Sequence, residues 1–198
     1  MQRTIFTTPG VNTFFKAVSL RWLKWRGWTI EGQMPADASK SVLIAAPHTS
    51  NWDLPMTLMV AFALELNPRW MGKASIFNAP FGGLMRWLGG IAVDRSKSNN
   101  LVEHSAQAIR DADGPLQLIV PPEGTRSKTR HWKTGFYYIA HSAQVPIVMA
   151  YMDYSTKRSG LGPLFEPTGN VEADMARIKA FYKPFKGKNA DQFESEDA

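Results

Sequence analysis

The chain is predicted to form a single α/β domain with a mostly parallel central sheet flanked by helices. Short apolar runs of strand length alternate with longer segments of helical periodicity, an order typical of parallel sheets covered by helices. The 198 residues, 44% of them hydrophobic, are enough for one well-buried core. The chain has no cysteine, which excludes disulfides, a thiolate nucleophile and cysteine-ligated zinc.

The first thirty residues are predicted to contain an amphipathic helix. Five basic residues and no acidic residue occur there. Apolar side chains fall on one stripe about 100° wide, made of Val11, Phe14, Phe15, Val18, Trp22 and Trp25. A basic helix with such a stripe is typical of a membrane-surface anchor, so residues 1–30 are assigned to a membrane-facing segment. The alternative is that the stripe packs against the chain's own domain.

Residues 31–188 are assigned to the α/β domain. Strands are predicted at 41–46, 69–72, 91–93, 116–120 and 145–151, where short apolar runs are bounded by turn residues. Helices are predicted at 54–66, 81–88, 99–112, 132–142 and 171–185, where apolar residues recur with helical spacing. Residues 189–198 hold four acidic residues and no basic one, and we expect them to form a disordered tail.

A histidine and an aspartate follow the first strand of the domain. His48 comes directly after Pro47, at the carboxyl end of the strand, where open α/β sheets place their binding crevices. On a continuous helix, residues five apart point about 140° away from each other, so His48 and Asp53 meet only if the helix begins near Ser50 or Asn51. Asp53 would then hold one ring nitrogen and leave the other as a base.

A structural role for Asp53 is equally compatible with the sequence. Ser50 and Asp53 have the spacing of a capping box at the start of a helix. A capped first turn would also hold the carboxylate still, so the two roles do not exclude each other.

A second polar segment follows the strand at 116–120. There the apolar run enters a Pro/Gly loop that contains Glu123, Gly124, Thr125 and Arg126. Since parallel strands end at the same edge of a sheet, this loop is expected near His48. The alternative is an ordinary solvated turn.

Together these segments resemble the glycerolipid acyltransferase family, whose familiar members are the 1-acylglycerol-3-phosphate acyltransferases. The resemblance rests on a strand that ends in HxxxxD, from His48 to Asp53, and on a strand about seventy residues later that ends in PPEGTRS. Two weaker blocks lie in the expected order, at 89–95, which ends with Arg95, and at 145–148. The resemblance covers about residues 41–151.

The resemblance implies O-acyl transfer from a thioester, either acyl-CoA or acyl carrier protein, to the hydroxyl of a lysophospholipid such as 1-acylglycerol-3-phosphate. His48 would be the general base, and Asp53 would fix its tautomer and stabilise the imidazolium. Acceptor binding would fall to Arg95, Glu123, Gly124, Thr125 and Arg126, with the arginines suited to phosphate. No metal and no further cofactor are expected.

Two mechanistic points can be added from the residues. Backbone amides just after His48, or in the Glu123–Gly124 loop, are candidates for stabilising the oxyanion. A covalent mechanism through Ser50 is disfavoured, because the chain lacks the GxSxG elbow that exposes a nucleophilic serine. The other histidines, at 104, 131 and 141, are interpreted as solvated or structural.

Departures from the family pattern leave the acceptor open. Pro47 stands where many members have asparagine, and the last block lacks a second proline. Another lysolipid or an aminolipid is therefore an alternative acceptor. A thioester hydrolase with the same His–Asp pair and a catalytically silent membrane-binding module also stay open.

The expected surroundings of the chain follow from its charge and its first residues. A net charge of +6 suits an anionic membrane surface or an acidic donor, and no nucleic-acid-binding motif occurs. The first residues do not form a secretion signal. We therefore expect a cytoplasmic protein, peripheral on the inner face of the membrane, with membrane lipids and the acyl donor as its partners.

Overall fold

The structure of the chain is a computed structural model that describes residues 3–93, 98–124 and 131–193, with only the backbone at 98–100. Its helices are α1 (Val11–Trp25), α2 (Asp53–Ala63), α3 (Gly82–Trp87), α4 (Ser98–Arg110), α5 (Gly135–Ala143) and α6 (Val171–Tyr182). Its strands are β1 (Thr29–Glu31), β2 (Lys40–Ala46), β3 (Pro68–Lys73), β4 (Gly90–Val93), β5 (Leu116–Val120), β6 (Ile147–Asp153) and β7 (Arg158–Phe165). Short 3-10 helices cover Ala36–Ala38, Ala74–Phe77 and Ala190–Gln192.

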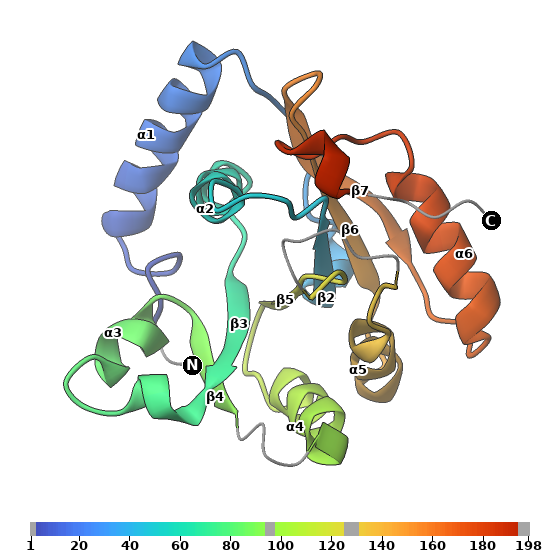
Figure 1. The fold of residues 1–198 in the computed structure, drawn as a ribbon. Helices are drawn as coiled ribbons and strands as arrows, with labels where there is room; N and C mark the ends of the chain where they lie inside the picture. Colours follow the sequence, from blue (N-terminus) through green and yellow to red (C-terminus); the bar gives the residue numbers. More distant parts are fainter. Residues whose placement is uncertain (1–2, 94–97, 125–130, 194–198) are drawn as a thin grey trace.

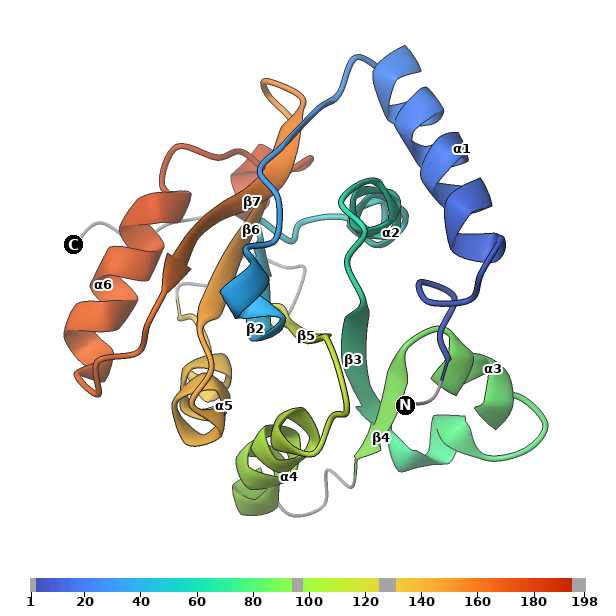
Figure 2. The ribbon, with the colours of Figure 1, turned by 180° about the vertical axis from the view of Figure 1, so that it is seen from behind.

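The strands form one sheet of seven in the order β1-β7-β6-β2-β5-β3-β4. From β6 to β4 all neighbours are parallel, and the antiparallel pairing is that of β6 with β7. Figures 1 and 2 show this sheet with α1 and α2 on one side and with α4, α5 and α6 on the other. The predicted α/β class with a mostly parallel sheet is therefore confirmed.

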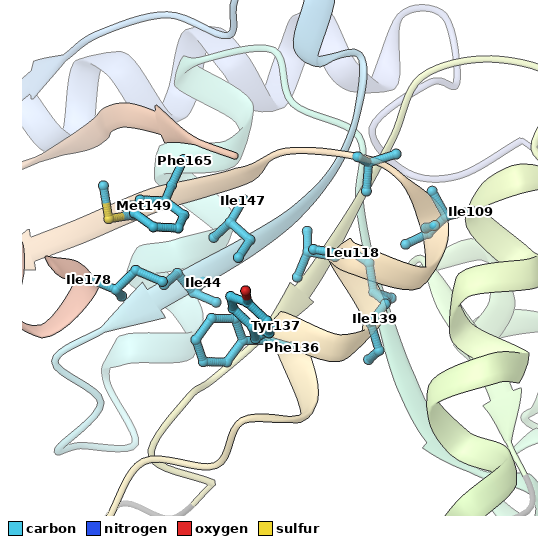
Figure 3. Packing of buried hydrophobic residues seen from close by; sticks show 14 of the residues in the cluster. Ile44, Ile109, Leu118, Phe136, Tyr137, Ile139, Ile147, Met149, Phe165 and Ile178 are labelled. Atoms are coloured by element: carbon cyan, nitrogen blue, oxygen red, sulfur yellow. The ribbon is translucent and has the colours of Figure 1, made fainter. Parts of the chain in front are cut away.

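Each face of the sheet has its own apolar cluster, because successive side chains of a strand point to opposite faces. Ile44 of β2 belongs to the larger cluster, which contains side chains of α4, α5 and α6 (Figure 3). Leu43, its neighbour in the chain, belongs to a smaller cluster that contains Ala61 and Phe62 of α2. Both clusters are needed to position β2, from whose end His48 follows.

The sequence analysis missed β1 and β7. The segment of β7 contains Gly160, Gly162 and Pro163, which are poor strand formers. In the folded chain Gly160 lies so close to β1 that a Cβ atom there would be 2.0 Å from the carbonyl oxygen of Glu31. Pro163 lies beyond the residues that pair with β1, so its missing N–H breaks no ladder bond on that side.

Helix α1 packs against α2 with its apolar stripe turned mostly outward. The buried residues of α1 are Ser19 and Leu23, and the Phe15 ring stacks on Phe62 with centroids 5.1 Å apart. By contrast, Phe14, Val18 and Trp25 are 62%, 46% and 75% exposed. Packing of the stripe onto the domain therefore holds for the half-buried Trp22 and in part for Phe15, but not for these three residues. In the described part of the chain, no helix is long and apolar enough to cross a membrane.

The tail begins later than the sequence analysis placed it. Residues 189–193 fold back on the domain instead of forming the start of a disordered tail. The side chain of Asn189 donates to the carbonyl of Thr49 at 2.8 Å, and Phe193 packs against the larger apolar cluster. These contacts join segments about 140 residues apart, and the acidic composition of the tail gave no sign of them. Residues 194–198 lie outside the described part.

Candidate active site

His48 lies at the carboxyl end of the central strand β2, between the ends of β5 and β6. The helix that follows begins at Asp53 and not near Ser50 or Asn51, as the sequence suggested. A turn precedes it, in which the N–H of Asp53 donates to the carbonyl of Ser50 at 3.2 Å. The sequence analysis expected an early helix start to bring Asp53 to His48. In the structure this turn brings the two residues together instead.

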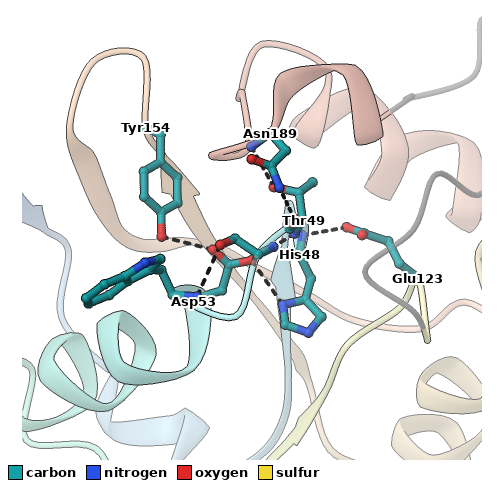
Figure 4. Close-up of polar contacts among 8 residues, drawn as sticks. His48, Thr49, Asp53, Glu123, Tyr154 and Asn189 are labelled. Atoms are coloured by element: carbon teal, nitrogen blue, oxygen red, sulfur yellow. Dashed lines mark hydrogen bonds and ion pairs between the residues drawn. The ribbon is translucent and has the colours of Figure 1, made fainter.

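The His48 and Asp53 side chains are in contact. Nδ1 of His48 lies 3.2 Å from Oδ2 of Asp53 (Figure 4). The Asp53 side chain is 5% exposed and that of His48 is 29% exposed. Asp53 favours the tautomer with the ring proton on Nδ1, which leaves the lone pair on Nε2. Among the described residues Nε2 has no hydrogen-bond partner, so it is available to act as a base.

Asp53 is fixed by three further hydrogen bonds. Its Oδ2 accepts the backbone N–H groups of Thr49 and Ser50, each at 2.8 Å, and its Oδ1 accepts the Tyr154 hydroxyl at 2.9 Å. Burial raises the pKa of Asp53, but the hydrogen bonds from His48, Ser50, Tyr154 and Thr49 outweigh burial and bring the pKa below its ordinary value. Asp53 is therefore a carboxylate at neutral pH.

Of the two hydrogen bonds of a capping box, the structure contains one. Asp53 accepts from the N–H of Ser50, as the acidic member of a capping box does. The Ser50 hydroxyl does not accept from Asp53 in return but from the N–H of Trp52, at 3.2 Å. Since one oxygen of Asp53 serves both Ser50 and His48, the capping contact also orients the carboxylate toward the imidazole.

Glu123 lies against the backbone of His48. It is 3% exposed, and its Oε1 accepts the His48 N–H at 2.9 Å. The sequence analysis assigned Glu123 to acceptor binding, and in the structure its side chain contacts the loop that carries His48. Gly124, its neighbour, has φ +66°, in the left-handed region that favours glycine. Arg95, Thr125 and Arg126 lie outside the described residues.

The environment of Glu123 gives the protein a pH-dependent stability. Burial raises the pKa of this carboxyl to about 7, against the opposing effect of the His48 N–H. The folded state therefore keeps a proton, between pH 4.5 and 7, that the unfolded state has already released. This contribution is fully present below the unfolded pKa and is lost as the pH rises through 7.

Glu123→Gln is expected to remove that loss, because glutamine does not ionise and its carbonyl still accepts the His48 N–H. Between pH 4 and 8 the unfolding free energy of wild type should fall relative to that of the variant by roughly 3 kcal/mol, at about 1.4 kcal/mol for each pKa unit. Denaturant unfolding at several pH values measures this. Glu166→Gln, at an exposed site, is the control and should run parallel to wild type. Parallel curves for Glu123→Gln would show that Glu123 ionises as freely as a solvated glutamate.

Two residues that hold the site were missed by sequence reasoning. Tyr154 lies in the β6–β7 turn, and Asn189 follows α6; both are far in sequence from the residues they hold. The N–H of Asn189 also donates to the Thr49 hydroxyl, at 3.2 Å. No local pattern marks either residue, and the fold alone reveals them.

The amides near His48 are already used within the protein. The N–H groups of His48, Thr49 and Ser50 donate to the carboxylates of Glu123 and Asp53. The N–H of Gly124 donates to the carbonyl of Pro121 at 3.2 Å. Three of these amides, those of Thr49, Ser50 and Gly124, are among the oxyanion donors that the sequence analysis considered, and they are not free for that role in this conformation.

A narrow apolar cavity borders the dyad and is called the catalytic cavity here. It has a volume of about 50 Å³ and lies between α2 and the sheet, with His48 and Asp53 in its wall. Small residues on the facing elements leave this space, namely Ala45, Ala61, Ala150 and Gly160. His48 and Asp53 thus adjoin a space with mostly apolar walls.

An imidazole in contact with a buried carboxylate, beside an apolar cavity, is an arrangement that can serve as a general base in acyl-group chemistry. The comparisons agree with this class. The model of the Acyltransferase family matches residues 27–153, more than half of the chain, and the chain belongs to this family. It is an acyltransferase, as the sequence motifs indicated. Tyr154 and Asn189 lie outside the matched segment.

The fold is also that of a solved acyltransferase. The crystal structure of the 1-acyl-sn-glycerophosphate (LPA) acyltransferase PlsC from Thermotoga maritima is similar to this structure, with a TM-score of 0.59 and 17% sequence identity. The similarity covers 90% of this chain and 81% of that chain. No curated protein sequence matches the chain significantly.

Proposed function

We propose that the chain transfers an acyl group from acyl-CoA or acyl carrier protein to the hydroxyl of a lysophospholipid such as 1-acylglycerol-3-phosphate, with His48 as general base. The observation that carries this proposal is the Nδ1–Asp53 contact, which leaves Nε2 available beside the catalytic cavity. The similarity to PlsC supports a lysophospholipid as the default acceptor.

The reaction then needs no enzyme nucleophile. Nε2 takes the proton of the acceptor hydroxyl as its oxygen attacks the thioester carbonyl. Asp53 stabilises the imidazolium that forms. The tetrahedral intermediate collapses, the C–S bond breaks, and Nε2 returns the proton to the departing thiolate. Ser50 is unsuited to a covalent role, because its hydroxyl oxygen accepts from Trp52 and contacts the start of the helix.

The two substrates are assigned to different parts of the site. The catalytic cavity is narrow, so we place only the first carbons of the acyl chain there. Arg95 and Arg126, with Gly124 and Thr125, stay proposed ligands of the acceptor phosphate. Glu123 is reassigned to the support of His48 on the strength of its 2.9 Å contact.

The exposed stripe of α1 is proposed to lie on the inner face of the cytoplasmic membrane. Phe14, Val18 and Trp25 would enter the lipid interface, and the basic residues of residues 1–30 would face anionic headgroups. An amphiphilic acceptor would then reach the site from the bilayer.

The test is a screen of lysolipid acceptors with a labelled acyl-CoA, followed by the same screen with acyl carrier protein. Acylation of 1-acylglycerol-3-phosphate above all other acceptors is expected. Preferential acylation of an aminolipid would replace the acceptor but keep the chemistry. Release of free fatty acid in excess over transfer to every lysolipid would instead identify a thioester hydrolase.

A further inference from the structure

A second pocket, called the tryptophan pocket here, is linked to the His48 site through Tyr154, which lines the pocket and donates to Asp53. It has a volume of about 410 Å³, within the usual range of ligand pockets. Four indole rings from α1, the α1–β1 connection and the start of α2 line it, namely Trp22, Trp25, Trp28 and Trp52. It shares no lining residue with the catalytic cavity.

Three cations from distant parts of the chain meet at this pocket. Arg26 follows α1, Lys157 lies in the β6–β7 turn, and Lys188 follows α6. None of the residues that line the pocket is acidic. Within the described ranges, no salt bridge joins any of these three side chains to a carboxylate. The pocket therefore carries a positive charge that no salt bridge among the described residues neutralises.

Aromatic rings contact two of these cations, and a backbone carbonyl accepts from the third. The Arg26 guanidinium lies 5.8 Å from the Trp22 ring and 5.7 Å from the Trp25 ring. The Lys188 ammonium lies 4.8 Å from the Trp52 ring, and that of Lys157 donates to the carbonyl of Arg26 at 3.2 Å. Such contacts orient a cation without removing its charge, so each can still bind an anion.

The pocket continues into the apolar surface of α1. Trp22 and Trp25 also line a shallow outer hollow with Phe14 and Val18, whose side chains form the exposed stripe. A ligand that fits both surfaces has an anionic group for the cations and apolar chains for the stripe. Tryptophan and basic side chains side by side are typical of the headgroup level of a membrane.

We infer that the tryptophan pocket binds the headgroup phosphate of an anionic bilayer phospholipid that does not react. The inference rests on the proposed membrane-facing role of α1. Neither His48 nor Asp53 lines this pocket, but Tyr154 does, and its hydroxyl donates to Asp53 at 2.9 Å (Figure 4). The bound lipid would anchor the start of α2, where Trp52 directly precedes Asp53.

The experiment measures lipid binding by the full chain. Lys157→Gln combined with Lys188→Gln removes two cations of the pocket, both at exposed positions. Lys73→Gln combined with Lys183→Gln is the matched control, because it removes the same charge at exposed positions that lie outside residues 1–30 and do not line the pocket. Thermal unfolding of each variant establishes that it is folded. Sedimentation with vesicles of phosphatidylcholine, with and without phosphatidylglycerol, and titration with soluble dihexanoyl phosphatidylglycerol give the affinities.

Binding of the pocket variant to phosphatidylglycerol vesicles is expected to weaken roughly 25-fold, about fivefold for each charge, and the control should weaken much less. The soluble lipid should bind wild type saturably, and inorganic phosphate should compete only weakly. Equal losses in both double variants would mean general charge attraction. Equal affinity for inorganic phosphate, or no saturable binding of the soluble lipid, would also overturn the inference. Neither measurement involves turnover, so a failure here is distinct from a failure of the proposed acyl transfer.

Discussion

His48→Ala is expected to lower the rate of acyl transfer by roughly 10²–10⁴-fold, the usual contribution of a positioned general base. The loss should fall on kcat, because the imidazole acts when the hydroxyl proton moves in the transition state. Steady-state transfer from acyl-CoA to the best acceptor of the screen measures it.

The fold should tolerate this substitution. His48 contacts Glu123 through its backbone N–H, which alanine retains, and Asp53 keeps its bonds from Thr49, Ser50 and Tyr154. His104→Ala, at an exposed position of α4, is the matched control and should retain activity. Near-wild-type turnover by a well-folded His48→Ala protein would remove His48 from the mechanism.

Asp53→Asn is expected to produce the second large loss, on the order of 10²–10⁴-fold in kcat. Asparagine has one acceptor oxygen, whereas the carboxylate of Asp53 accepts from His48, Thr49, Ser50 and Tyr154. If the amide oxygen serves the two backbone N–H groups, its NH₂ group cannot accept from the imidazole, so the tautomer is no longer held. The imidazolium also loses its counter-charge.

A cap alone would behave differently, because asparagine is a good residue at a helix start. Full activity of Asp53→Asn would therefore mean that Asp53 only caps α2. The pH dependence of stability gives an independent measure. Since the folded pKa of Asp53 is depressed, its charge stabilises the fold above the unfolded pKa, and this stabilisation is lost as the pH falls through the folded value. The Asn variant should lack that acid-side loss.

Most strands of the central sheet were predictable because each is indicated by a pattern within its own short segment. The apolar runs that form β2, β3, β4 and β5 lie within one or two residues of the predicted strands. A run of this kind has to be buried wherever it lies, and its short length between turn residues indicates a strand. The pairing of His48 with Asp53 was predictable for the same reason, since one turn of five residues decides it.

Strand β7 was missed because its own sequence pattern does not indicate a strand. Its glycines look like loop residues in the sequence, yet Gly160 is required by the backbone of β1 and Gly162 by the ring of Phe181. The need for a small residue arises only when a second segment approaches. Propensity therefore indicated the wrong structure for a segment whose conformation is determined by its neighbours.

By itself the sequence determined the fold class, the acyltransferase family, the dyad of His48 and Asp53 and an amphipathic first helix. The tertiary structure alone decided that Glu123 contacts the backbone of His48 and that Tyr154 and Asn189 bond to the segment from Thr49 to Asp53. It also decided that most of the α1 stripe is exposed. It also brought Arg26, Lys157 and Lys188 to one pocket. A polar contact between residues a hundred positions apart leaves no period in the sequence, because its partner is chosen by the packing of whole strands and helices.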